Sequence, residues 1–146
     1  MESPIFVQQL SPSSGDIDAL GHVNNLVYLR WVQDIAVAHS DAVGGDFAAY
    51  QRVGSVFVVR RHEVEYLRPA LLEDTLELRT FIVDWRGASS WRETRIFRQR
   101  DGQELAHART LWVFVDKAHG RPRRIPASLL SDFRREVPGT LPMTST

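Results

Sequence analysis

The alternation of apolar and polar positions predicts one long amphipathic helix early in the chain. Apolar residues recur every three or four positions between Asn24 and Val43, and charged or amide side chains fall mostly between them. The apolar positions are Tyr28, Trp31, Val32, Ile35, Ala36, Ala38, Ala42 and Val43. Asn24 or Asn25 can cap the start, and Gly44-Gly45 can end the helix in the left-handed conformation. The helix would be roughly 30 Å long, so we expect it to lie buried along a sheet.

Strand composition and alternation mark five further segments. These are Ile5–Leu10, Ser55–Leu67, Thr75–Asp84, Ser89–Gln99 and Glu104–Asp116. The first is short and leads into a serine and proline loop, as edge strands do. The last is apolar on both faces, which is typical of a strand inside a sheet. In the second, strict alternation places Phe57 and Val59 on one face and His62, Val64 and Tyr66 on the other.

Turn residues separate these segments. Trp85-Arg86-Gly87 has turn composition, and Asp101-Gly102 suits the two positive φ angles of a type I′ hairpin turn. Asp46 to Val53 is predicted to be a connector with room for a helical turn, and a short helix is predicted near Ala127 to Arg135. The order of strand, long helix and four strands predicts an α+β domain, with the helix on one face of an antiparallel sheet. The uncovered face and edge of such a sheet favour self-association.

Composition fits a single domain, residues 1–146, with a tail at 136–146 that we expect to be flexible. Lys and Arg number 18 and Asp and Glu number 18, so overall charge does not favour nucleic acid or an anionic membrane as a partner. The absence of cysteine excludes a thiol nucleophile, a thiolate zinc site and disulfides. We find no signal peptide and no apolar stretch of membrane-spanning length, so we expect a cytoplasmic protein.

Polar residues that could take part in catalysis cluster directly before the predicted helix. From Asp16 to Tyr28 the pattern is D-x-D-x-x-G-H-V-N-N-x-x-Y, with two carboxylates, a glycine, an imidazole and two amides. A single carboxylate just before a helix more often stabilises the helix dipole than takes part in catalysis. The full spacing is more specific, and it places the acids beside the free N–H groups of a helix start, where negative charge is stabilised.

Other catalytic signatures are absent from the sequence. The chain has no G-x-S-x-G, Walker, G-x-G-x-x-G or H-E-x-x-H motif. His39, His62, His107 and His119 lack the spacing of metal ligands, so we predict no metal site and give these histidines no role. The tryptophans in the strands are expected to pack rather than to frame a ligand.

The stretch from Asp16 to Tyr28 resembles the hotdog-fold acyl-CoA thioesterases, in the 4-hydroxybenzoyl-CoA thioesterase-like group. A looser similarity runs from Val58 to Thr75 and on to Trp112 and Phe114, so it covers nearly the whole chain. The resemblance implies a hotdog fold, a five-stranded antiparallel sheet wrapped around one long central helix. It also implies hydrolysis of an acyl-CoA to a free acid and coenzyme A, without metal or cofactor, by a homodimer or homotetramer.

The same resemblance implies roles for residues of the motif. Asp18 would be the catalytic carboxylate, as a nucleophile or as a base for water, and the backbone amide of Asn25 would polarise the thioester carbonyl. His22 is either catalytic or orienting, or it caps and packs. Asn24 is expected to cap the helix at the edge of the substrate site, and Tyr28 is expected to contact the substrate.

Coenzyme A carries a 3′-phosphate and a diphosphate, so the rim of its site needs cations. The family resemblance points to Arg86 and Ser89 in one turn and to Arg121 and Arg123 in a later basic turn. An isolated basic turn is more often simply solvated. We therefore expect these four residues to bind substrate only within the thioesterase interpretation.

Two other functions are open at this stage. A non-catalytic hotdog module would bind acyl thioesters without turnover. A hydratase or dehydratase of the same fold would carry a different motif on its helix, which this chain lacks. The identity of the acyl group, and the choice between coenzyme A and an acyl-carrier protein, are not predicted.

Overall fold

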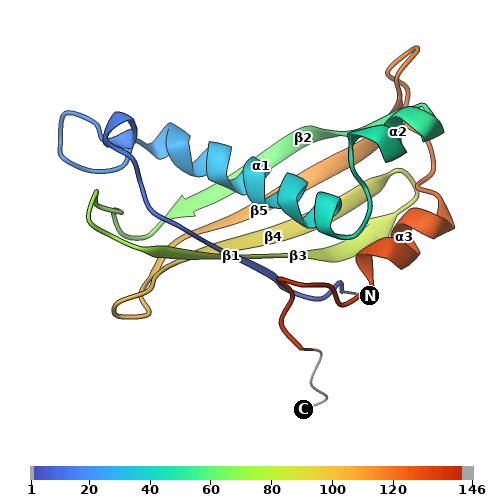
Figure 1. The fold of residues 1–146 in the computed structure, drawn as a ribbon. Helices are drawn as coiled ribbons and strands as arrows, with labels where there is room; N and C mark the ends of the chain where they lie inside the picture. The colour runs from blue at the N-terminus through green and yellow to red at the C-terminus, as the bar shows by residue number, and fades with distance from the viewer. Residues whose placement is uncertain (1, 143–146) are drawn as a thin grey trace.

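The structure is a computed structural model that describes residues 2–142. A five-stranded antiparallel sheet lies against one long helix, with two short helices near one end of the sheet (Figure 1). The strands are β1 (Phe6–Leu10), β2 (Ser55–Tyr66), β3 (Leu76–Arg86), β4 (Ser89–Arg98) and β5 (Glu104–Asp116), and the helices are α1 (Asn25–Ala42), α2 (Phe47–Val53) and α3 (Ala127–Phe133). The order in the sheet is β1-β3-β4-β5-β2, so β1 is an edge strand and β5 lies inside. The predicted α+β architecture is confirmed.

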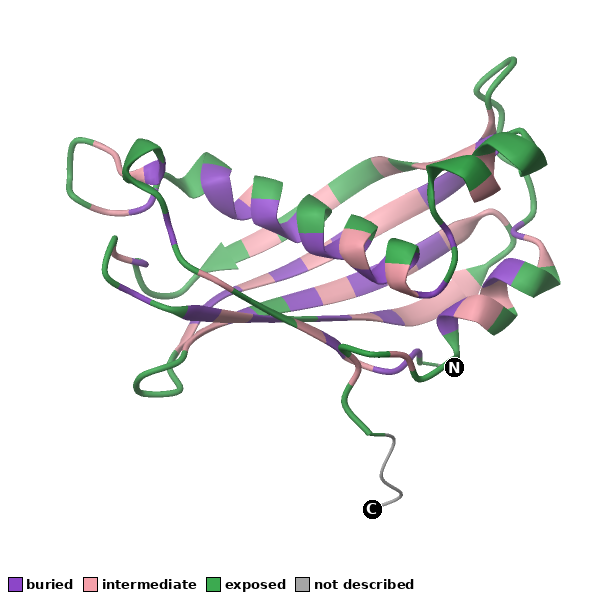
Figure 2. Cartoon of the chain, in the orientation of Figure 1, coloured by how far each residue is buried: buried purple, intermediate pink, exposed green. Residues whose placement is uncertain are grey.

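Helix α1 buries one stripe of side chains against the sheet and leaves the other in water (Figure 2). Its buried residues are Val27, Tyr28, Trp31, Val32, Ile35, Ala36, His39 and Ser40. Asn24 caps the start, as its side chain accepts a hydrogen bond from the backbone N–H of Leu26 at 2.9 Å. The helix ends before Gly44, whose φ of 97° suits glycine. The predicted helix and its apolar face are confirmed.

The two faces of the sheet are covered differently. Leu78 and Ile82 of β3 and Ile96 of β4 are buried on the face toward α1. On the outer face, the guanidinium groups of Arg79 and Arg95 lie over the ring of Phe97, at 5.0 and 5.3 Å from its centroid. Arginine side chains therefore cover part of the apolar outer face that was expected to need a partner.

Strand β2 departs from strict alternation because it contains a bulge near its middle, where its register against β5 shifts. Ahead of the bulge, Phe57 packs on Phe114, and after it His62 forms a hydrogen bond with Thr110 at 2.9 Å. Thr110 and Phe114 share one face of β5, so Phe57 and His62 also share a face. Their predicted placement on opposite faces is wrong, because the extra residue of the bulge reverses the alternation.

The hairpin between β4 and β5 is confirmed, but its predicted turn type is wrong. A type I′ turn needs two positive φ angles, and in the described part of the chain only glycines have one; here it is Gly102, at 70°. The Asp101 carboxylate instead accepts hydrogen bonds from Arg98 Nη2 at 3.1 Å and from the backbone N–H of Gln103 at 3.2 Å. These side-chain bonds stabilise a longer turn.

The turn between β3 and β4 was predicted too early in the chain. Strand β3 continues through Trp85 and Arg86, and the chain reverses at Gly87-Ala88, where Gly87 has a φ of 58°. The ring of Trp85 packs against that of Phe133, with centroids 5.7 Å apart. This tertiary contact holds the predicted turn residues in the strand.

Part of the expected flexible tail runs beside β1. The backbone N–H of Leu141 donates to Ile5 O at 2.8 Å, and that of Val7 donates to Gly139 O at 2.8 Å. The last residues of the tail, 143–146, lie outside the described residues. Residues 139–141 are thus tied to the sheet edge by backbone hydrogen bonds.

Asp16 ties the turn before α1 to the helix. Its Oδ2 accepts hydrogen bonds from the backbone N–H and the hydroxyl of Ser13, at 2.9 and 3.0 Å, and its Oδ1 pairs with Arg30 Nη2 at 2.8 Å. The Asp16 carbonyl accepts from the N–H of Asn24 at 2.8 Å. The bond from Ser13 and the pairing with Arg30 lower the pKa of this buried carboxyl. The first acid of the motif is therefore structural.

Replacing this carboxylate should destabilise the fold. We expect Asp16→Ala to lower the free energy of unfolding by about 2 kcal/mol, because Ser13 and Arg30 lose their hydrogen bonds to a buried, charged acceptor. Since the pKa of Asp16 is lowered on folding, its contribution is present above the usual carboxyl value of 3.8 and is lost as pH falls through the folded value. Urea unfolding at pH 7 and under acid conditions measures both effects. Equal stability of Asp16→Ala and a control at the exposed Glu73, Glu73→Ala, would contradict this role.

Candidate active site

The Asp18 side chain borders a cavity of about 380 Å³ beside the start of α1. We call it the Asp18 cavity. Its wall comes from three places: the turn before the helix, the first turn of α1, and the end of β2 with the residues that follow it. The lining residues are Asp18, Leu20, His22, Val23, Asn24, Asn25, Tyr28, Tyr66, Leu67, Arg68 and Pro69. The structure thus brings together all five residues of the motif for which the sequence predicted catalytic or substrate contacts.

Backbone amides hold Asp18 by one carboxylate oxygen. Its Oδ1 accepts hydrogen bonds from the backbone N–H groups of Leu20 at 2.9 Å and His22 at 3.3 Å. The backbone of Asp18 also donates to His22 O at 2.8 Å, which closes the turn. Oδ2 accepts no hydrogen bond from residues 2–142. The carboxylate is therefore fixed in orientation and keeps one oxygen available for a reacting group.

Capping leaves one free donor at the start of α1. The N–H of Leu26 donates to the Asn24 side chain, and that of Val27 donates to Asn24 O at 2.9 Å. The N–H of Asn24 itself is used by Asp16. No acceptor within the described residues takes the N–H of Asn25, which lies on the wall of the Asp18 cavity. One amide at the positive end of the helix dipole thus remains available to a ligand.

Two tyrosines join the end of β2 to the start of α1. The Tyr28 hydroxyl accepts a hydrogen bond from the N–H of Ala70 at 2.9 Å, and the Tyr66 hydroxyl donates to Asn25 O at 3.0 Å. Their rings pack edge to face, with centroids 5.3 Å apart. Burial raises the pKa of Tyr28, so this phenol stays neutral at physiological pH. Sequence reasoning missed Tyr66, because its contact with α1 depends on the bulge in β2.

His22 contributes to the site through its backbone as well as its ring. Its N–H and carbonyl both bond to Asp18, and its half-buried side chain lines the Asp18 cavity. Asn24, which lines the same cavity, caps the helix as the sequence predicted. His22 is therefore placed where an imidazole can contact a ligand beside Asp18.

The four residues predicted to bind coenzyme A lie far from Asp18 within one chain. Arg123 Nη1 donates to Val53 O at 2.9 Å and to Ser55 Oγ at 2.8 Å, at the start of β2. The Asp18 cavity lies at the other end of this strand, roughly 36 Å away at 3.3 Å per residue.

The other three lie at the same end of the sheet as Arg123. Arg86 pairs with Asp84 at 3.1 Å, and Ser89 follows it at the turn between β3 and β4. Arg121 lies next to the end of β5, where its carbonyl accepts from the N–H of Asp116 at 2.9 Å. None of these residues lines the Asp18 cavity of its own chain.

Arg68 is a cation of the Asp18 cavity that sequence reasoning did not single out. It follows β2 directly, and its Nε donates to the side chain of Gln103. An Arg-Pro pair after a long strand was the available signal, since it puts a charged side chain at the strand end next to the predicted helix start. A phosphate at the mouth of this cavity would meet the Arg68 guanidinium.

Residues 2–142 contain no group of three or more His, Asp or Glu side chains placed to hold a metal ion. In the same part of the chain, no helix is both long and apolar enough to cross a membrane.

The chain is similar to several known proteins. The sequence pattern of the thioesterase-like superfamily matches residues 13–133. The acyl-CoA thioester hydrolase YbgC of Escherichia coli O6:H1 is 39% identical over 83 residues, which cover 54% of this chain and 58% of YbgC. The zebrafish protein THEM6 is 34% identical over 87 residues, which cover 60% of this chain and 43% of THEM6. The chain thus spans about half the length of these curated relatives.

Solved structures extend the likeness to the fold. A thioesterase of Thermus thermophilus in complex with coenzyme A and zinc superposes with a TM-score of 0.77 at 27% identity, over 88% of this chain and 91% of that one. A mutant 4-hydroxybenzoyl-CoA thioesterase bound to 4-hydroxybenzoyl-CoA gives 0.82 at 22% identity, over 90% and 99%. The chain therefore belongs to the thioesterase-like superfamily and has the hotdog fold of that family.

Proposed function

We propose that this protein is an acyl-CoA thioesterase, which hydrolyses an acyl-CoA thioester to a free acid and coenzyme A. The observation that carries the proposal is that one cavity is lined both by Asp18, with an oxygen that accepts no hydrogen bond from residues 2–142, and by Asn25, with an N–H that has no acceptor among them. The name of YbgC, an acyl-CoA thioester hydrolase, and the coenzyme A bound to the Thermus thermophilus thioesterase support it.

The reaction needs the carbon of the thioester carbonyl near the Asp18 carboxylate. It also needs the oxygen of that carbonyl near the Asn25 N–H. Asp18 attacks the carbonyl directly, to form an anhydride that water then cleaves, or it takes a proton from the water that attacks. In both routes the bond from the carbonyl carbon to sulfur breaks, and the thiolate leaves and takes up a proton. The Asn25 N–H stabilises the oxyanion that forms on the carbonyl oxygen.

His22 has two possible contributions in this proposal. Its backbone N–H orients Asp18, and this role survives any change of its side chain. Its imidazole also lines the Asp18 cavity, where it can act as a base. We assign the main chemical role to Asp18, because two backbone amides fix its carboxylate.

Substitution of Asp18 tests the assignment. We expect Asp18→Asn to lower the rate of thiol release from a panel of short, long and aromatic acyl-CoAs by about 100-fold or more, because the amide neither attacks nor accepts a proton. The change should be much smaller for His22→Gln, which keeps the backbone bond. Asp34→Asn is the matched control, since Asp34 is an exposed acid of α1 outside the cavity.

Wild-type turnover in a folded Asp18→Asn protein would remove this residue from the mechanism. Binding of acyl-CoA by the wild-type protein with no release of thiol would favour the non-catalytic binding module. Formation of a 3-hydroxyacyl product from an enoyl-CoA would indicate the hydratase class.

The free amide of Asn25 can be removed by proline. Asn25 is the first helical residue, where proline is tolerated, and Asn24 has φ −59° and ψ 135°, which suit a residue before proline. We expect Asn25→Pro to fold and to lose about 100-fold in turnover number, because one oxyanion donor is missing.

Asn25→Ala keeps the N–H and serves as the matched variant for this test. It should retain a turnover number at least about tenfold above that of the proline variant. Circular dichroism shows whether α1 is intact in both. Equal activity of the two variants would mean that this amide does not polarise the carbonyl.

A second copy of the chain is part of the proposal. Leu20, Leu26 and Leu67 are exposed at or next to the Asp18 cavity, and the free edge of β2 lies beside it. The basic residues expected to bind coenzyme A lie a strand length away in the same chain. We propose that a homodimer or homotetramer brings Arg86, Ser89, Arg121 and Arg123 of one copy toward the Asp18 cavity of another.

Light scattering coupled to size-exclusion chromatography tests this assembly. At micromolar concentration we expect the mass of a dimer or a tetramer, because exposed apolar side chains and an open strand edge are then covered. Leu26→Glu should shift the population toward the monomer, while the capped helix start stays intact. A purely monomeric, fully active wild-type protein would contradict the shared site.

A further inference from the structure

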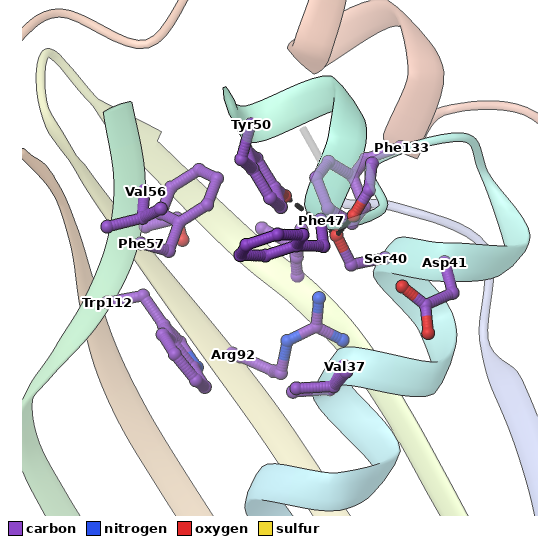
Figure 3. Close-up of a pocket in the computed structure, with 14 residues that line it drawn as sticks. Val37, Ser40, Asp41, Phe47, Tyr50, Val56, Phe57, Arg92, Trp112 and Phe133 are labelled. Atoms are coloured by element: carbon purple, nitrogen blue, oxygen red, sulfur yellow. Dashed lines mark hydrogen bonds between the residues drawn. The ribbon is translucent and has the colours of Figure 1, made fainter. Parts of the chain in front are cut away.

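A second cavity, of about 370 Å³, lies at the other end of α1 (Figure 3). Its walls come from the second half of α1, from α2 and α3, and from the start of β2, and its floor comes from β3, β4 and β5. We call it the Arg92 cavity after the side chain that rises from its floor. It shares no lining residue with the Asp18 cavity. Its volume is within the range of small-molecule sites, about 300–1,000 Å³.

Arg92 is a buried cation without a carboxylate partner. Only 4% of the residue is exposed. Its Nη1 donates to His39 Nδ1 at 3.0 Å and to Thr80 Oγ1 at 3.1 Å. No Asp or Glu of residues 2–142 lies within ion-pair distance, and Asp41, an exposed acid that borders the cavity, does not pair with it. Arginine is rarely buried unless it is paired, so this arrangement calls for an explanation.

The charge of Arg92 is not neutralised by its neighbours. Burial lowers the pKa of Arg92 to about 10, so the guanidinium remains charged at pH 7. Burial, and the nearby Arg92 charge, lower the pKa of His39 to about 3, so that ring is neutral. The ring of Phe133 is another neighbour, and its centroid lies 5.9 Å from Arg92 Cζ. One full positive charge therefore faces an apolar cavity.

Unused hydrogen-bond donors gather in this cavity. The two bonds of Arg92 come from Nη1, so Nε and Nη2 have no acceptor among residues 2–142. These two nitrogens form the side of the guanidinium that binds a carboxylate with two parallel bonds. Trp112, which also lines the cavity, has a buried indole N–H without a partner among the same residues. The two side chains lie side by side in Figure 3.

Most of the remaining wall is apolar, and its polar members are Ser40, Tyr50, Ser90 and the exposed Asp41. The Ser40 hydroxyl donates to Gly45 O at 2.7 Å and lies 2.7 Å from the Tyr50 hydroxyl. Phe57 contributes an aromatic surface inside, and Val37 and Phe47, which are 53% and 71% exposed, are the most open part of the lining. A ligand that fits this cavity has an apolar body and one anionic end with acceptor oxygens.

We propose that the Arg92 cavity is a binding site for a free aliphatic carboxylic acid, whose carboxylate pairs with the Arg92 Nε and Nη2 groups and whose chain lies against Phe57, Phe47 and Val37. This class of molecule is also the acid product of the proposed hydrolysis, but the site is separate from the reacting one. Along α1, the residues that line the two cavities are at least eight positions apart, or roughly 12 Å along the helix. Binding at Arg92 therefore does not require Asp18.

Calorimetric titration with octanoate tests the site. We expect octanoate to bind the wild-type protein at one site per chain, and octanamide, its uncharged analogue, to bind at least about tenfold more weakly. Arg92→Met should weaken octanoate binding by a similar factor and reduce the preference for octanoate over the amide. Arg95→Met is the matched control, because Arg95 is exposed on the same strand and points to the opposite face.

Two further variants separate this site from the active site and from a folding defect. Val37→Trp fills the mouth of the Arg92 cavity at an exposed position, and it should abolish octanoate binding in a protein whose circular dichroism is unchanged. Asp18→Asn should bind octanoate as the wild type does, whether or not that variant has lost hydrolysis. The two proposals can therefore fail independently.

Three results would overturn the proposal. The first is octanoate affinity in Arg92→Met within a few-fold of that of the wild type. The second is equal affinity of the wild type for octanoate and octanamide. The third is unchanged octanoate binding in Val37→Trp, which would place the ligand elsewhere. If Arg92→Met does not fold, the amide comparison and Val37→Trp decide the question.

Discussion

The burial of one face of α1 against the sheet is the interaction on which the rest of the structure depends. This contact places the start of the helix beside the end of β2 and its last turn beside β3 and β4. The hydrogen bond from Ala70 N–H to the Tyr28 hydroxyl fixes the first of these contacts at a buried position. Both cavities border α1, one toward each end, so the packing of this helix on the sheet also sets where small ligands have room.

The two acids of the motif show how local bonding separates structure from chemistry. Asp16 uses both carboxylate oxygens and its carbonyl to hold Ser13, Arg30 and Asn24 together. Asp18, two residues later, is held by backbone amides on one oxygen only. Full satisfaction makes a carboxylate a structural element, whereas partial satisfaction leaves an oxygen for a ligand. The backbone N–H groups of Leu20 and His22 orient Asp18, while Asp16 ties the start of the same turn to Arg30 of the helix.

Charged groups lie near both ends of α1, and Asp41 in its last turn opposes the dipole. Carboxylates lie before its N-terminus, and the buried Arg92 contacts His39 in its last turn. Anions are stabilised near the first end and cations near the second. The proposed reaction would use an acid at the N-terminal end of this helix, and the proposed binding site would use a cation near its C-terminal end, which is the order of charges that the dipole favours. A hotdog fold with one central helix offers both ends to small ligands.

The sequence by itself determined the helix, the strands and the chemical motif, since these depend on residue spacing over a few positions. Apolar periodicity located α1, and the short spacing of Asp18, His22 and Asn25 keeps them close together, in a turn that is also tied to Ala70 O by the N–H of Val23. Only the tertiary structure decided which backbone N–H groups remain without an acceptor. The Asn24 side chain accepts from the N–H of Leu26, and Asp16 O accepts from the N–H of Asn24, so the N–H of Asn25 is left between them.

Long-range packing also decided features that no local pattern carries. The bulge in β2 turns His62 and Tyr66 toward α1, and Trp85 stays in its strand because it packs on Phe133. Arg92 lies between Trp91 and Glu93 on β4, and this local pattern does not predict its burial; it is buried where His39 and Thr80, from two other elements, supply acceptors for it. Sequence periodicity predicts which residues share a face of a strand. Whether a charged side chain can be buried depends on the hydrogen-bond acceptors that the neighbouring elements supply.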